Sequence, residues 1–106
     1  MTDPKLVSSA FKAFMTEAPD HAKAWGQLVR ALAEASALDS KTQALAYLAV
    51  LAALGRESGI PFHVKGAKEA GATREEVISA ILVGLAPAGH GVTQALPAAI
   101  AAYDSD

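Results

Sequence analysis

The sequence contains no cysteine. Without a thiol, the chain can form no disulfide, supply no thiolate ligand to a metal ion and perform no thiol redox catalysis by itself. Aromatic residues are also scarce, at 6% of the chain. The hydrophobic core must therefore be built mainly from leucine, isoleucine, valine and alanine.

The sequence also lacks a cluster of basic residues, and its formal net charge is −2. Nucleic-acid binding needs a localised Lys/Arg surface, so we expect no nucleic-acid partner. The longest apolar run, from Ala44 to Leu54, is shorter than the roughly 20 residues that cross a membrane. The first residues are polar and interrupted by Pro4, unlike a signal peptide. We therefore expect no membrane partner and a cytoplasmic location.

The length of 106 residues predicts one domain covering residues 1–106. A domain this short buries a limited fraction of its surface, so self-association would stabilise it. Hydrophobic residues make up 52% of the chain and are mainly alanine, the strongest helix former. No segment alternates convincingly between apolar and polar residues as a strand does. These features predict an all-α fold.

Helical signals recur along the whole chain and predict about six helices. We expect them from Asp3-Pro4 to about Glu17, from Pro19 to about Ser36, from Asp39 or Ser40 to about Arg56, from about Pro61 to Ala70, from Thr73 to about Leu85, and from about Val92 to Tyr103.

Capping and breaking residues divide the second half of the chain. Gly71 is expected at the position just past a helix end, and Thr73 with Glu76 forms a capping-box pattern. Residues 86–91 are expected to form a break or a strained turn. Pro97 should kink the last helix or lie near its start.

The third predicted helix is apolar on nearly all sides, which is typical of a helix buried on several sides. Two interpretations remain open. In the first, another subunit covers part of its surface; in the second, the whole helix is the centre of the domain's own core.

Four short patterns resemble the carboxymuconolactone decarboxylase family, which also contains the AhpD-like alkylhydroperoxidases. They are Leu38-Asp39-Ser40-Lys41-Thr42, Ala53-Leu54-Gly55-Arg56, His63-Val64 and the stretch from Glu69 to Glu76. The resemblance implies an AhpD-like helical bundle that assembles with copies of itself as a trimer or hexamer, and we expect a hexamer.

The resemblance also implies what chemistry has been lost. Redox members carry a Glu on the apolar helix, two Cys in a Cys-x-x-Cys motif and a His after them. In this chain those positions are Ala44, Arg56, Gly59 and His63, so only the histidine is retained. The cysteine-free decarboxylase branch is the closer local match.

Three residues are the candidate catalytic group. His63 can act as a general acid or base near neutral pH, or it can be a structural histidine. Arg56 can hold a substrate carboxylate in a bidentate pair, or its charge can complement the end of a helix. Glu57 can act as an acid or base, or it can be an exposed loop carboxylate.

The other two histidines carry weaker hypotheses. His90 would join His63 only if both faced one pocket, and His21 is expected to be exposed to solvent. The three histidines lack metal-ligand spacing, so we expect neither a metal nor a cofactor.

Three functions are therefore weighed. The first is a decarboxylase-like lyase acting on a small lactone or organic acid. The second is a non-catalytic oligomer that binds a small molecule or a protein. The third, thiol peroxidase activity, is disfavoured because the chain has no cysteine.

Overall fold

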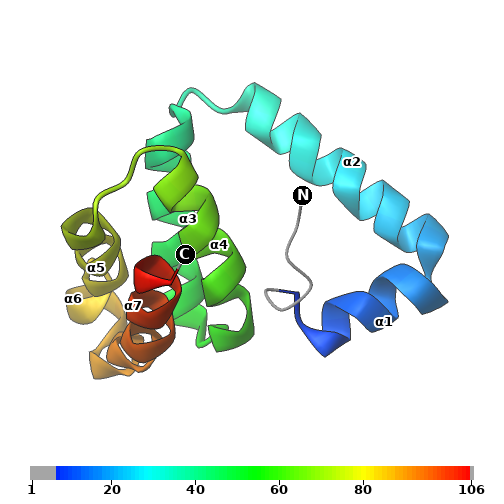
Figure 1. Cartoon of the computed structure of the whole chain (residues 1–106). Helices are drawn as coiled ribbons and strands as arrows, with labels where there is room; N and C mark the ends of the chain where they lie inside the picture. Colours follow the sequence, from blue (N-terminus) through cyan, green and yellow to red (C-terminus); the bar gives the residue numbers. More distant parts are fainter. Residues whose placement is uncertain (1–6, 106) are drawn as a thin grey trace. The chain divides into compact units, whose positions relative to one another are not determined.

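The computed structural model describes residues 7–105, and these residues form helices joined by short turns, with no strand among them (Figure 1). The predicted all-α fold is confirmed. Residues 1–39 and 40–106 form two compact units, which are described separately. The organisation of the chain as a single domain stays a prediction. Within residues 7–105, no helix combines the length and apolar character needed to cross a membrane.

The first unit contains helices α1 (Ser9–Glu17) and α2 (Pro19–Ala35). The predicted start at Asp3-Pro4 lies outside the described residues. In the part described, Ser8 caps α1, because its Oγ accepts a hydrogen bond from the backbone N–H of Phe11 at 3.1 Å. Helix α2 begins with Pro19 in its first turn, as predicted.

An aromatic cluster joins the two helices of this first unit. The ring of Trp25 on α2 meets the rings of Phe11 and Phe14 on α1 edge-on, at centroid distances of 5.5 and 6.3 Å. The apolar stripe of α2 continues beyond this cluster, and Leu28 and Leu32 remain exposed.

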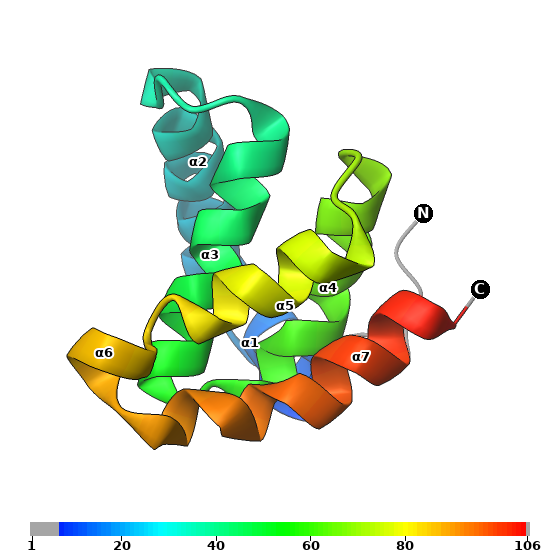
Figure 2. The ribbon, with the colours of Figure 1, turned by 90° about the vertical axis from the view of Figure 1, so that its left-hand side faces the viewer.

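The second unit contains every residue that the sequence analysis proposed for catalysis. Its elements are α3 (Ser40–Leu54), the 3₁₀ turn η2 (Glu57–Gly59), α4 (Ile60–Glu69), α5 (Arg74–Leu82), α6 (Leu85–Ala88), the 3₁₀ segment η3 (His90–Ala95) and α7 (Leu96–Asp104). Helix α3 packs against α4, α5 and η3, and α4 packs against α7. Figure 2 shows α5 in front of α3 and α4.

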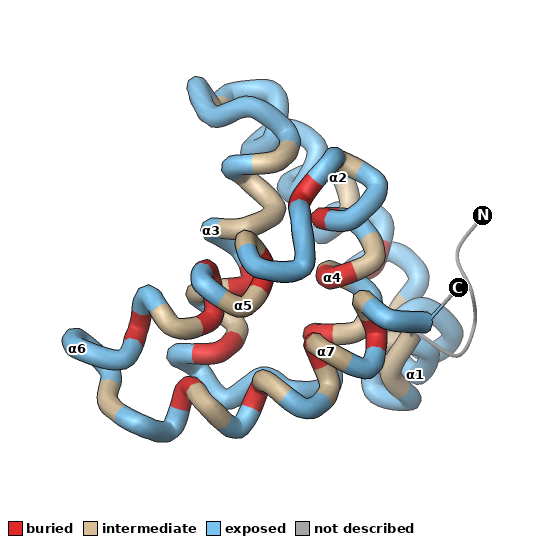
Figure 3. Tube along the Cα trace, turned by 60° about the vertical axis from the view of Figure 1, so that its left-hand side comes forward, coloured by how far each residue is buried: buried red, intermediate tan, exposed pale blue. Residues whose placement is uncertain are grey.

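The core of this unit lies where α3, α4, α5 and α7 face one another (Figure 3). Its largest fully buried side chains are Leu48, Ile60, Val64, Val77, Ile81 and Val92. Small buried alanines, among them Ala67 on α4 and Ala99 on α7, stand between them. This composition agrees with the prediction of an aliphatic core poor in aromatic residues.

Helix α3 is buried along one side and exposed along the other. Leu48 and Ala52 are in the core, whereas Tyr47, Val50 and Leu54 are 39%, 57% and 63% exposed. The chain's own core thus accounts for part of the apolar surface of α3. Burial of the remaining surface by another subunit stays a prediction.

The capping-box prediction is confirmed in detail. Thr73 Oγ1 accepts the backbone N–H of Glu76 at 3.1 Å, and Glu76 Oε1 accepts the backbone N–H of Thr73 at 2.8 Å. A 2.9 Å ion pair with Lys41 also fixes Glu76 and ties α5 to the start of α3. Gly71 has φ +99° just after α4, as expected for a residue past a helix end.

The expected break at residues 86–91 is wrong for its first half. Residues 85–88 form helix α6, because Pro87 lies in the first turn, where no intrahelical N–H donor is required. The turn is confined to Gly89, whose φ of +86° and ψ of −177° are accessible almost only to glycine. The predicted last helix is divided in two. Its first part, up to Ala95, is the 3₁₀ segment η3, and Pro97 lies near the start of α7.

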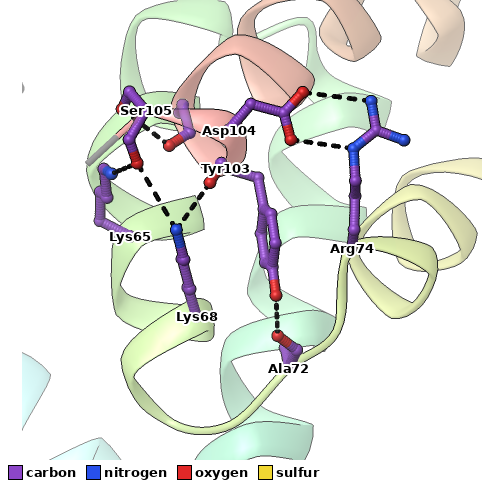
Figure 4. Close-up of polar contacts among 8 residues, drawn as sticks. Lys65, Lys68, Ala72, Arg74, Tyr103, Asp104 and Ser105 are labelled. Carbon is purple, nitrogen blue, oxygen red and sulfur yellow. Dashed lines mark hydrogen bonds and ion pairs between the residues drawn. The ribbon is translucent and has the colours of Figure 1, made fainter.

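Polar contacts fasten the end of α7 to α4 and to the turn before α5 (Figure 4). Lys65 Nζ donates to the carbonyl of Ser105 at 2.6 Å, and Lys68 Nζ donates to the carbonyl of Tyr103 at 2.8 Å. Tyr103 Oη donates to the carbonyl of Ala72, and Arg74 forms a forked pair with Asp104. The two lysines satisfy carbonyls that have no partner within the helix.

Candidate functional site

His63 lies near the start of α4, at the edge of its buried face. Ile60, Val64 and Ala67 recur at helical spacing and are buried in the core. His63 immediately precedes Val64, so its ring lies beside this face and is half-buried. Pro61 in the first turn of the helix fixes the backbone that carries it.

Two aromatic rings surround the imidazole of His63. The ring of Tyr47 on α3 stacks on it, with a centroid distance of 4.1 Å and an interplanar angle of 21°. The ring of Phe62 meets it edge-on, at 5.2 Å and 76°. Burial of the imidazole lowers the pKa of His63 below its ordinary value, because the charged form loses hydration. His63 is therefore largely neutral at pH 7.

The backbone of η2 passes close to the same imidazole. A Cβ placed on Gly59 would lie 3.9 Å from Cδ2 of His63 and 3.6 Å from the side chain of Leu51. These are ordinary van der Waals distances. Gly59 and His63, two of the positions aligned with the redox members, are thus neighbours in space as well as in sequence.

Arg56 and Glu57 flank this turn and are both exposed. Their backbones are ordered, since the N–H of Arg56 donates to the carbonyl of Leu51 and its own carbonyl accepts the N–H of Gly59. Within residues 7–105, neither side chain forms a hydrogen bond or an ion pair. Arg56 also follows the end of α3, where a positive charge complements the helix dipole. The catalytic assignment of all three residues stays a prediction.

The remaining histidines are exposed. His21 lies on the surface of α2, as expected. His90 begins η3, and it is not among the aromatic ring contacts of His63. Over residues 7–105, no three His, Asp or Glu side chains are grouped closely enough to hold a metal ion.

The resemblance places Ala44 where the redox members carry a carboxylate. It is half-buried and packs against the core of the second unit. This position therefore contributes apolar packing and supplies no proton-transfer group.

An open groove lies on a different side of α3, between that helix and α5. Its volume is about 580 Å³, and its lining residues are Thr42, Leu45, Ala46, Ala49, Glu75, Glu76, Ser79, Ala80 and Val83. None of the three predicted catalytic residues lines it. No sequence pattern predicted the groove as a whole, although the helical spacing of Thr42, Ala46 and Ala49 places small side chains on one face of α3.

The sequence pattern of the carboxymuconolactone decarboxylase family matches residues 19–102, from the start of α2 into α7. The chain belongs to this family. No curated protein and no solved structure gives a significant match.

Membership of the carboxymuconolactone decarboxylase family confirms the resemblance carried by the short patterns around His63. This member has no cysteine anywhere in its sequence, so thiol chemistry cannot come from the chain itself. The family assignment agrees with the helical fold.

Proposed function

We propose that this protein is a decarboxylase-like enzyme acting on a small lactone or organic acid, with His63 as the proton-transfer residue. One observation carries the proposal: a half-buried imidazole held against aromatic rings, with a lowered pKa. A histidine with this environment can accept and release a proton near neutral pH.

The chemistry of decarboxylation needs such a group. When the bond to the carboxylate carbon breaks, CO₂ departs and the bonding electron pair stays on the remaining carbon. That carbon must then receive a proton. The imidazolium form of His63 is the donor in this step: the lowered pKa makes each imidazolium a stronger acid and also makes this form a smaller fraction at pH 7. The neutral imidazole that remains is reprotonated from solvent.

Arg56 and Glu57 have the chemistry for two further roles. The exposed guanidinium of Arg56 can bind the carboxylate of an organic acid through two parallel hydrogen bonds. Glu57 can exchange protons with solvent at the mouth of the site. Because both are exposed in one chain, a second subunit packed beside η2 would complete the enclosure of this site.

The proposal is tested by ligand binding and turnover in wild type and His63→Gln. A panel of small lactones, aromatic acids and dicarboxylates is screened by thermal shift, since a ligand that binds the folded state raises the midpoint. Compounds that bind are then assayed for CO₂ release. We expect His63→Gln to lower the rate by about 10²–10⁴-fold, the usual contribution of general acid–base catalysis.

The matched control is His90→Gln, which changes an exposed histidine in the same unit. We expect its CO₂ release to equal that of wild type. Unchanged turnover in His63→Gln would contradict the proposed role of His63.

A second candidate function rests on the groove between α3 and α5. Its apolar lining and its separation from His63 favour a non-catalytic member that binds a small apolar molecule there. In that case a ligand would stabilise wild type and His63→Gln equally. Ala49→Phe, which fills the groove, would abolish the shift. A ligand response insensitive to Ala49→Phe would contradict this second function.

A further inference from the structure

We propose that Tyr47 is a positioning residue for His63, because its stacked ring holds the imidazole in the orientation needed for proton transfer. This inference rests on the proposed role of His63. It adds to the site a residue of α3 that none of the short sequence patterns contains.

The first argument is the geometry of the contact. The two ring centroids are 4.1 Å apart and the ring planes differ by 21°, so the rings lie nearly parallel. The terminal torsion of a histidine is broad and would otherwise allow the ring to turn. With one face against Tyr47 and the ring of Phe62 edge-on at 5.2 Å, the plane of the imidazole is held between two aromatic neighbours.

The second argument is the position of Tyr47 outside the core. Its neighbour Leu48 is fully buried, whereas Tyr47 is 39% exposed. The ring of Tyr47 therefore fills no space in the aliphatic core. Its aromatic contact is with His63, so the main consequence of the ring falls on that imidazole.

The charged groups on and near α4 either bind other partners or are exposed to solvent. Lys65 and Lys68 on α4 bind carbonyls at the end of α7. Arg74 pairs with Asp104, and Glu76 pairs with Lys41. Arg56 and Glu57 of the adjoining turn are exposed.

Burial is accordingly the cause of the lowered pKa of His63. Tyr47 covers one face of the imidazole and therefore contributes to that burial.

The experiment compares Tyr47→Ala, Tyr47→Phe and Leu28→Ala. Phenylalanine keeps the stacked ring, alanine removes it, and Leu28 is an exposed control on α2. The pKa of His63 is measured from the pH titration of its imidazole proton resonances by NMR. The rate constant kcat and KM are measured over the same pH range with a substrate found in the screen.

We expect Tyr47→Ala to raise the pKa of His63 toward its ordinary value and to lower kcat by roughly tenfold or more, with a smaller change in KM. Tyr47→Phe and Leu28→Ala should retain the wild-type pKa and kcat. Should the alanine variant fail to fold, Tyr47→Leu keeps an apolar side chain and should show the same loss of kcat.

Failure of this inference can be told apart from failure of the proposed function, because the NMR titration requires no substrate. An unchanged pKa of His63 in Tyr47→Ala would overturn the role of Tyr47, whatever the activity. An unchanged kcat would overturn it too. A raised pKa in a protein that turns over no compound would support the Tyr47–His63 contact and contradict the proposed function.

Discussion

At the scale of single residues, His63 lies in an aromatic environment formed by Tyr47 and Phe62. The resemblance places Gly59 and Ala44 where the redox members carry a thiol and a carboxylate. The half-buried ring of His63 loses hydration on protonation. The same desolvation that adjusts its acidity must therefore also affect folding.

Stability should fall as the pH drops through the titration range of His63. The folded-state pKa is lowered, whereas the unfolded chain titrates near the ordinary value of about 6.5. Below that pH the unfolded state binds a proton that the folded state does not, so protonation favours unfolding. This loss begins near the unfolded pKa and is complete below the folded pKa.

Urea unfolding at pH 7.5 and pH 5.5 measures this loss of stability. The partners of Glu76 and Asp104 lower the pKa values of these carboxylates, so both stay ionised over this pH range and do not affect the comparison. We expect His63→Gln to lose less stability than wild type between these pH values. His21→Gln, at an exposed position, should keep the wild-type difference. Equal pH dependence in wild type and His63→Gln would show that burial of this imidazole does not affect folding.

At the scale of elements, local signals predicted most helix boundaries. Pro19, Gly71 and the Thr73–Glu76 pair act within a few residues of themselves, and the structure has them where the sequence places them. Helix α6 was missed because Pro87 and the glycines after it resemble a continuous break. A proline in the first turn of a helix costs no hydrogen bond, and four residues give too little periodicity to detect.

The turn at Gly89 should be sensitive to substitution. Its φ of +86° with ψ of −177° strains any residue that has a Cβ, so Gly89→Ala should lower the free energy of unfolding by about 1–3 kcal/mol. Gly91→Ala is the matched control, because the φ of Gly91 is not positive and a Cβ added there would have no other heavy atom within 4 Å. Denaturant unfolding of both variants measures the difference. A loss as large for Gly91→Ala would mean that helix propensity or solvation, not the φ angle, sets the cost.

At the scale of the whole molecule, apolar surface remains exposed on α3 and α4. Tyr47, Val50, Leu54 and Phe62 are each more than a third exposed. A small chain gains stability by covering such a surface with another copy of itself. We propose that the protein is a trimer or hexamer, in line with what the family resemblance implies.

Sedimentation velocity tests this assembly. We expect wild type to sediment as a trimer or hexamer, and Leu54→Glu to shift it toward the monomer by placing a charge on the exposed apolar face. Ala53→Glu is the comparison for Leu54→Glu, because it places the same charge at the exposed alanine that precedes Leu54 on the same helix. A wild-type protein that sediments as a monomer would contradict the proposal.

The sequence by itself determined the all-α class, the aliphatic core, the capping box and the absence of thiol chemistry. Each of these depends on residue type or on neighbours a few positions away. Only the tertiary structure decided that Tyr47 stacks on His63 and that a groove opens between α3 and α5. Both depend on how two helices are rotated and spaced against each other. The sequence does not specify that rotation strongly, because many contact positions are alanine. A small apolar residue can pack on any of several faces of a helix equally well.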